Sequence, residues 1–185
     1  MLNFANILTM SRIAAIPLIV GFLLLNGAFW HWMALALFVL ACVTDWFDGY
    51  VARRLHQVSP LGRFLDPIAD KLVVAAVLMV LVATRHIEGW AILAALIILC
   101  REILVSGLRE FLAELNVKIH VTQLAKWKTM MQMVALGVLL TGDAGERVLP
   151  GITLVGLILL WLAALLTLWT GYDYLRAGII HAMER

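Results

Sequence analysis

Six long apolar segments, spread along the whole chain, limit what this sequence can fold into. Only short polar links separate them, and they cover residues 7–25, 29–51, 61–83, 90–112, 124–140 and 152–175. About 20 apolar residues are enough to cross the roughly 30 Å hydrocarbon core of a bilayer. Because a bilayer offers no water to backbone N–H and C=O groups, such segments must form helices. The sequence therefore predicts an all-α, polytopic membrane protein with six transmembrane helices in a single domain, residues 1–185.

The composition agrees with this prediction. Hydrophobic residues make up 64% of the chain and charged residues 14%, whereas soluble domains contain about 25% charged residues. This excludes a soluble domain carrying one membrane anchor. Cys42 and Cys100 lie inside apolar segments, where cysteine usually acts as a small hydrophobic residue, so we expect no disulfide, metal or redox role. The first basic residue, Arg12, comes too late for the charged region of a cleaved signal peptide.

The distribution of lysine and arginine predicts how the helices cross the membrane. If the N-terminus is placed inside, only two of the 14 basic residues, Arg85 and Arg147, fall in outer links, and the other twelve (14 − 2) fall in the inner half. Inner loops of membrane proteins carry an excess of basic residues, so we expect both termini to be cytoplasmic. Trp30, Trp32 and Trp90 then lie at the outer interface, where amphipathic rings are favoured.

Four aspartates lie in the second and third segments. Each carboxylate would cost roughly 2.5–3.5 kcal/mol at the centre of a membrane helix, and less near its ends. Asp45 and Asp48 are three residues apart and Asp66 and Asp70 are four apart, so each pair shares one face of a helix, about 60° and about 40° apart. The link through Pro60 makes the two helices antiparallel neighbours. Both pairs are therefore expected to converge near the cytoplasmic edge of the membrane.

Converging carboxylates predict a site for divalent cations. Mg²⁺ and Mn²⁺ prefer oxygen ligands, and two such metals about 4 Å apart suit phosphoryl transfer. Two alternatives remain at this point. The aspartates could form purely structural ion pairs with Arg53, Arg54 or Lys71, or they could belong to a cation transporter. A transporter is expected to place its carboxylates near the bilayer midplane, often in repeated halves, whereas this chain clusters them at one edge and has no internal repeat.

The aspartates belong to a longer pattern, Asp45-x-x-Asp48-Gly49-x-x-Ala52-Arg53, then eight residues, then Gly62-x-x-x-Asp66-x-x-x-Asp70. This pattern resembles the signature of the CDP-alcohol phosphatidyltransferases, integral membrane enzymes of phospholipid synthesis. All eight fixed positions are filled. The resemblance extends over the chain, since it includes six spans with the signature straddling the second and third.

The resemblance implies a role for each signature residue. The four aspartates would hold two divalent cations, Mg²⁺ or Mn²⁺, that grip the pyrophosphate of CDP-diacylglycerol. Asp66 and Asp70 would be the catalytic residues, with Asp70 as the base toward the attacking hydroxyl. CDP-diacylglycerol would be bound by Gly49, Ala52, Arg53 and Gly62. From the residues alone, Gly49 and Ala52 leave room for a ligand on one face, and ordinary packing through small residues explains them equally well.

Four stretches of the sequence favour one acceptor. The sequences NILTMSRIAAIPL, TDWFDGYVARR, REILVSGLRE and KWKTMMQ resemble the branch of the family that transfers a phosphatidyl group to sn-glycerol 3-phosphate and releases CMP. A member with another acceptor, such as serine or inositol phosphate, is the same-family alternative. Direct displacement is favoured over a phosphatidyl-enzyme, because no Ser, Cys or His stands out beside the aspartates.

A phosphorylated acceptor needs fixed cations, and four basic residues are candidates. Arg101 and Arg109 are eight residues apart, about 80° around a helix, so both can face one cavity. Lys126 and Lys128 lie about 200° apart on a helix, so we expect only one of them to point into it. The alternatives are lipid contact and positive-inside topology for the lysines, and ion pairs with Glu102 or Glu110 for the arginines.

The resemblance also implies partners and location. We expect a homodimer in the bacterial cytoplasmic membrane, with its active site facing the cytoplasm. CDP-diacylglycerol would keep its acyl chains in the bilayer, while its nucleotide and glycerol 3-phosphate enter from the cytoplasm. No nucleic-acid partner is expected.

Overall fold

Helices form almost all of the described chain. The computed structural model describes residues 4–25, 27–55, 60–114 and 123–183, without the side chains of 4–7, 46–55, 60–64, 66, 113–114, 125 and 173–183. Within those ranges there are seven helices and no strand. They are α1 (Phe4–Leu24), α2 (Ala28–Leu55), α3 (Pro60–Ala83), α4 (Ala91–Glu114), α5 (Gln123–Leu140), α6 (Gly142–Val148) and α7 (Ile152–Met183). The all-α prediction is confirmed, and each of the six apolar segments coincides with one long helix.

Three of these helices are long and apolar enough to cross a membrane by length and composition. Their apolar stretches are Ala28–Asp45 in α2, Ala91–Leu112 in α4 and Ile152–Tyr172 in α7, and α1 contributes a shorter stretch, Leu8–Leu24. Helices α3 and α5 carry charged residues in their first halves, which lowers the mean hydropathy there. The described chain is therefore a helical membrane protein with at least three candidate spans.

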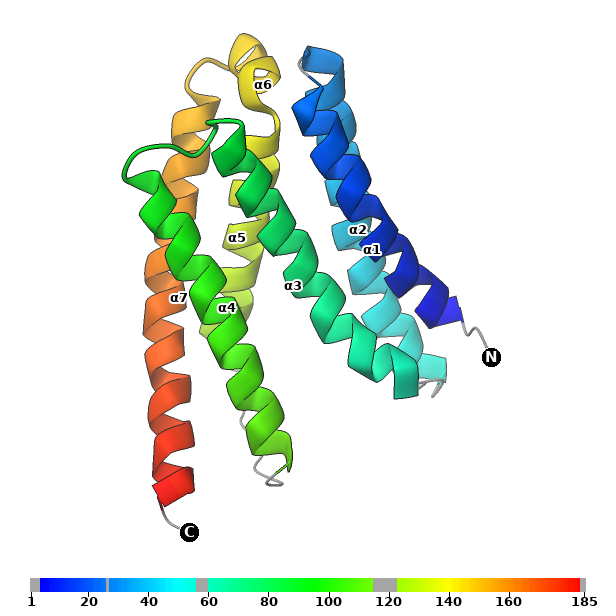
Figure 1. Cartoon of the computed structure of the whole chain (residues 1–185), viewed down its shortest axis with the longest axis vertical. Coiled ribbons are helices and arrows are strands. Elements are labelled where there is room, and N and C mark those ends of the chain that lie inside the picture. The colour runs from blue at the N-terminus through cyan, green and yellow to red at the C-terminus, as the bar shows by residue number, and fades with distance from the viewer. Residues whose placement is uncertain (1–3, 26, 56–59, 115–122, 184–185) are drawn as a thin grey trace.

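The helices run up and down in a bundle made of two groups (Figure 1). Helix α1 packs against α2 and α3, and α7 packs against α4 and α5, while α2–α5 and α3–α4 contacts join the groups. The start of α1 and the end of α7 lie at the same end of the bundle, and α6 lies at the opposite end (Figure 1). The second half of α2, the first half of α3, the second half of α4 and the first half of α5 therefore share one end.

Close packing of α5 against α7 depends on a small residue. A Cβ atom at Gly156 would lie 2.8 Å from Leu139 Cδ2 and 3.0 Å from Val138 Cγ1. Leu139 is itself buried, together with Leu136 and Leu160 in the same apolar core. Small residues let membrane helices approach closely and gain van der Waals contact. Gly156 thus sets the separation of the two helices.

The short helix α6 was not predicted, since residues 141–150 were interpreted as a polar link. Its Glu146 joins it to α7: Oε1 accepts from the Gly151 backbone N–H at 2.6 Å, and Oε2 accepts from the Thr153 hydroxyl at 2.9 Å. These hydrogen bonds, together with one from the Thr153 backbone, lower the pKa of Glu146. The carboxylate therefore satisfies amide groups at the start of α7 that have no intrahelical partner.

A histidine pair lies at the same end. His31 is buried, its Nδ1 is 3.0 Å from the Leu140 carbonyl oxygen, and its ring centroid is 5.1 Å from that of His86. Burial and the neighbouring His31 lower the pKa of His86. Gly142, at φ 48°, touches both rings, and a Cβ there would lie 2.3 Å from His86 Nε2. His31 is therefore part of the packing at this end of the bundle.

Candidate functional site

Two of the predicted metal-binding aspartates come together on neighbouring helices. Asp45 on α2 and Asp70 on α3 both accept hydrogen bonds from the same nitrogen, Nη1 of Arg12, and its distance to Asp70 Oδ1 is 2.7 Å. Both carboxylates are 46% exposed. The convergence expected from the spacing is therefore confirmed for this pair. Asp48 and Asp66 lie in the same helices, but their side chains are outside the described residues.

Arg12 is the residue that sequence reasoning missed. It was counted only as a basic residue on the inner side, whereas its side chain is 2% exposed and connects α1 to α2 and α3. A guanidinium group in an apolar environment needs ionic partners, because burying an isolated charge is very costly. An arginine inside the first apolar segment was the available signal, since such residues usually face the bundle interior.

The structure also places all four candidate phosphate-binding residues around one cavity of about 490 Å³. One wall carries Asp45, Asp70 and Lys71. The opposite wall, from α4 and α5, carries Arg101, Glu102, Arg109, Lys126, Lys128 and Gln132. Arg101 and Arg109 line the same cavity, as their spacing on one helix allows. The cavity thus has an acidic side and a basic side.

The expectation that only one of the two lysines reaches this cavity is wrong. Lys128 is 2% exposed, whereas Lys126 is exposed, and both line the cavity. Lys126 lies in the first turn of α5, and a lysine has a long flexible stem that can reach beyond the face on which its Cα lies. An angular argument based on Cα positions underestimates the reach of such a side chain.

Glu102 organises the basic side. Its Oε1 accepts from Lys128 Nζ and lies 3.6 Å from Arg101 Nη1. Arg101 Nη2 also donates to Thr170 Oγ1 on α7 at 3.2 Å. Gly171 leaves room for this arginine, since a Cβ there would lie 3.2 Å from Arg101 Cγ. Arg101 therefore does pair with Glu102, as the alternative interpretation proposed. The basic side of the cavity has four cationic side chains and this one carboxylate among its lining residues, so its net charge is positive.

The remaining predicted binding residues can be placed only by their backbone. Gly49, Ala52 and Arg53 lie in the last turns of α2, and Gly62 lies in the first turn of α3. Their side-chain environment is outside the described residues. Only four residues, 56–59, separate the two helices, so these positions border the end of the bundle at which the aspartates lie.

The donor set fits a hard divalent cation. Oxygens of Asp45 and Asp70, from two different helices, already converge on one positively charged group, and carboxylate oxygen is the ligand that Mg²⁺ and Mn²⁺ prefer. Among the residues whose side chains are described, no group of three or more His, Cys, Asp or Glu is placed to hold a metal. Two further donors, Asp48 and Asp66, would have to complete the set.

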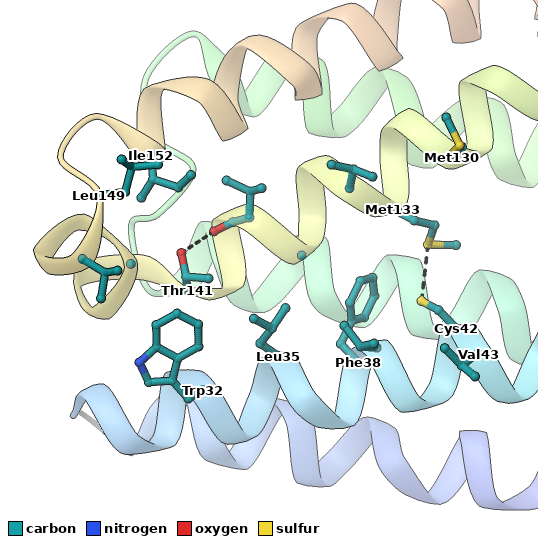
Figure 2. Close-up of a pocket in the computed structure, with 16 residues that line it drawn as sticks. Trp32, Leu35, Phe38, Cys42, Val43, Met130, Met133, Thr141, Leu149 and Ile152 are labelled. Atoms are coloured by element: carbon teal, nitrogen blue, oxygen red, sulfur yellow. Dashed lines mark hydrogen bonds between the residues drawn. The ribbon is translucent and has the colours of Figure 1, made fainter.

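An apolar groove adjoins the polar cavity. It lies between α2 and α5, has a volume of about 490 Å³, and is lined at one end by Trp32, Leu149 and Ile152 (Figure 2). At the other end it reaches Met130 and Met133, which also line the polar cavity. The sulfur atoms of Cys42 and Met133 are 4.0 Å apart across the groove. Polar and apolar spaces thus meet at the two methionines.

Comparison with known proteins assigns this architecture to a family. The model of the CDP-alcohol phosphatidyltransferase family matches residues 2–169. The chain belongs to this family. The matched range includes Arg12, the four aspartates and the basic side of the cavity, so both sides of the cavity lie within the region that matches the family.

Individual relatives narrow the comparison. A protein of Rickettsia bellii is 47% identical over 175 residues, covering 95% of this chain and 94% of its own. Relatives from Pectobacterium atrosepticum and Cereibacter sphaeroides are 42% and 41% identical, with 95% and 96% of this chain covered and 94% and 96% of theirs. All three are named CDP-diacylglycerol–glycerol-3-phosphate 3-phosphatidyltransferase.

Proposed function

We propose that this protein is a CDP-diacylglycerol–glycerol-3-phosphate 3-phosphatidyltransferase. It transfers the phosphatidyl group of CDP-diacylglycerol to sn-glycerol 3-phosphate, giving phosphatidylglycerophosphate and CMP in phospholipid biosynthesis. The observation that carries this function is the two-sided cavity, in which Asp45 and Asp70 face Arg101, Arg109, Lys126 and Lys128. The names and near-full-length similarity of the relatives support the same reaction.

The acidic side binds the reacting end of the lipid nucleotide. Asp45, Asp48, Asp66 and Asp70 would hold two divalent cations, Mg²⁺ or Mn²⁺, which when bound neutralise pyrophosphate charge and stabilise departing CMP. Gly49, Ala52, Arg53 and Gly62 would bind the nucleotide end of CDP-diacylglycerol, as the family resemblance implies. Arg12 keeps the carboxylates of Asp45 and Asp70 in a common orientation through the hydrogen bonds from its Nη1.

The basic side binds the acceptor. Arginine recognises phosphate through two parallel hydrogen bonds and lysine through a point charge, so Arg101, Arg109, Lys126 and Lys128 together suit the phosphate of glycerol 3-phosphate. Held there, the acceptor turns its primary hydroxyl toward Asp70. Asp70 takes the proton as the hydroxyl oxygen attacks phosphorus, and the phosphorus–oxygen bond to CMP breaks. The transfer is a direct displacement without a phosphatidyl-enzyme.

The apolar groove suits an acyl chain of CDP-diacylglycerol. Its lining is almost entirely hydrophobic, and it meets the polar cavity at Met130 and Met133. A lipid bound there would place its phosphates on the acidic side while its chain stays within the membrane. The methionine side chains are flexible and polarisable, which suits contact with chains of varying shape.

We propose a membrane arrangement that agrees with this placement. Helices α1 to α5 and α7 cross the bacterial cytoplasmic membrane as six spans of one domain, with both termini and the active site on the cytoplasmic side. The lysines and arginines of the cavity support this orientation, since α4 ends and α5 begins at the end of the bundle where α1 begins and α7 ends (Figure 1). The protein acts as a homodimer, as the family resemblance implies.

The test is CMP release by the purified protein in detergent, with CDP-diacylglycerol and Mg²⁺. Glycerol 3-phosphate, serine, inositol and inositol phosphate are supplied as separate acceptors, and Asp66→Asn and Asp70→Asn are the control variants. We expect release only with glycerol 3-phosphate, and its loss in both variants. Release with a different acceptor would contradict the acceptor assignment. No release from folded, metal-supplied protein with any acceptor would contradict the reaction itself.

A further inference from the structure

Gln132 on α5 is a buried polar residue without an evident structural purpose. Its side chain lines the polar cavity and the residue is 2% exposed. Its Oε1 atom has no hydrogen-bond partner among the residues that the structure describes. A buried acceptor left unpaired destabilises a fold, and most such groups in proteins are satisfied. The atom is therefore a candidate for contact with a ligand.

The neighbouring cations already have oxygen partners within the protein. Lys128 donates to Glu102, Arg101 donates to Thr170, and Lys71 donates to the backbone oxygen of Pro67. An amide oxygen accepts hydrogen bonds and donates none. No described residue donates to Gln132 Oε1, so a substrate that enters the cavity can supply the missing donor.

The position of Gln132 indicates which of the two substrates it can contact. The sulfur atoms of Met133 and Cys42 are 4.0 Å apart, so Gln132, which precedes Met133, lies near the level of Cys42. Cys42 is about one helical turn deeper in the bundle than Asp45. The proposed nucleotide-binding residues Gly49 and Ala52 lie on the far side of Asp45, about 6–10 Å further along α2 at 1.5 Å per residue. The hydroxyl and amino donors of cytidine therefore belong at the other end of the site.

The acceptor offers the remaining donor. Gln132 lies four residues after Lys128, and side chains with this spacing are neighbours on a helix, with Cβ atoms roughly 5–6 Å apart. Two side chains so placed can contact neighbouring groups of one small ligand, such as the phosphate and the secondary hydroxyl of glycerol 3-phosphate. Phosphate oxygens donate no hydrogen bond when ionised, and the primary hydroxyl gives its proton to Asp70. Only the secondary hydroxyl is left to donate.

We propose that Gln132 accepts a hydrogen bond from the C2 hydroxyl of the acceptor and thereby selects a glycerol phosphate over phosphorylated alcohols that lack this group. The proposal rests on the proposed function and names a specificity-determining residue of the same site. A site built to bind a hydroxyl rejects an analogue without it far more strongly than an apolar site does, because the protein acceptor then stays unpaired.

The experiment compares two acceptors with two proteins. The acceptors are sn-glycerol 3-phosphate and the monophosphate of propane-1,3-diol, which lacks only the C2 hydroxyl. The proteins are the wild type and Gln132→Met, which keeps the volume and flexibility of the side chain and removes the amide. We expect kcat/KM of the wild type to favour glycerol 3-phosphate by roughly tenfold or more, and this ratio to fall to within about twofold in the variant.

Two further readouts distinguish this role from a structural one. Removing an unpaired buried oxygen should leave the melting temperature unchanged or raise it, and the KM for CDP-diacylglycerol should not change. If Gln132→Met has no activity, calorimetric binding of both acceptors to folded Asp70→Asn protein, with and without Gln132→Met, gives the same ratio without turnover.

The outcomes are separable. A wild-type enzyme that uses both acceptors equally, or a preference that survives in Gln132→Met, would overturn the proposal and leave the proposed function standing. A fall in melting temperature with an unchanged ratio would show that Gln132 is structural. Failure of wild-type protein to use glycerol 3-phosphate at all would instead contradict the proposed function.

Discussion

At the scale of single residues, the Arg12 guanidinium does most to organise the described part of the site. It contacts a carboxylate from α2 and another from α3 while lying on α1. Without it, Asp45 and Asp70 would repel each other in a partly buried position, and three helices would lose a common ionic contact. We infer that Arg12 positions the carboxylates and does not itself touch the reacting atoms.

This role makes Arg12→Met a sharp test. Loss of one partner from a buried ion pair costs about 3–5 kcal/mol. Because both aspartates are 46% exposed, solvent screening weakens the pair, and we expect the free energy of unfolding to fall by about 1–3 kcal/mol. Arg12→Lys should recover part of it, since it restores the charge. Denaturant titration in detergent measures the loss, with Arg147→Met in α6 as the exposed control. Equal stability of the Arg12→Met and Arg147→Met proteins would contradict the role.

Residue spacing predicted part of this site and missed the rest for identifiable reasons. The meeting of Asp45 with Asp70 follows from helical periodicity and a short connection. So does the shared cavity of Arg101 and Arg109. Arg12 was missed because a basic residue near the start of a span also satisfies the positive-inside rule, which hides its pairing. The buried state of Gln132 was invisible in the sequence, because its exposure depends on α5 packing against distant helices.

At the scale of helices, the six apolar segments predicted the six long helices, while α6 escaped prediction. Its seven residues, Gly142–Val148, lack the length for a periodic pattern, and their polarity is typical of a link. What stabilises α6 is tertiary: Glu146 hydrogen-bonds the start of α7, and Gly142 packs on the two histidines. Such contacts between distant segments leave no local signal in the sequence.

Packing of α5 against α7 supports a prediction at this scale. A Cβ at Gly156 would lie within 3.0 Å of both Leu139 and Val138, and Leu139 is buried and has little room to move. Gly156→Ala should therefore destabilise the protein by about 1–3 kcal/mol through overpacking. Gly107→Ala is the matched control, because a Cβ there meets nothing within 4 Å, and alanine in an open helix should stabilise by up to about 1 kcal/mol.

Thermal unfolding of both variants in the same detergent gives the comparison. A lower melting temperature for Gly156→Ala together with an equal or higher one for Gly107→Ala is the expected pattern. If both glycine variants melt alike, α5 and α7 are not as closely packed as the structure shows.

At the scale of the whole molecule, the fold brings one acidic and one basic wall together at the end of a bundle, beside an apolar groove. The acidic wall comes from the first group of helices, α1 to α3, and the basic wall comes from α4 and α5. The cavity therefore exists only when the two groups are packed against each other. The phosphorylated acceptor binds to one wall and the lipid nucleotide to the other. The two substrates therefore meet at the boundary between the two groups of helices.

The central claim, that each wall serves one substrate, is tested most directly by measuring KM for both substrates in Arg109→Gln and Asp45→Asn proteins. Loss of a charge-assisted hydrogen bond worth roughly 1.5–3 kcal/mol should raise the KM for glycerol 3-phosphate in Arg109→Gln by about tenfold or more, with the KM for CDP-diacylglycerol unchanged. Asp45→Asn should lower kcat and weaken the use of CDP-diacylglycerol and metal, with little effect on the KM for glycerol 3-phosphate. Equal shifts in both KM values for either variant, or an unchanged KM for glycerol 3-phosphate in Arg109→Gln, would contradict the division of the cavity into two substrate sites.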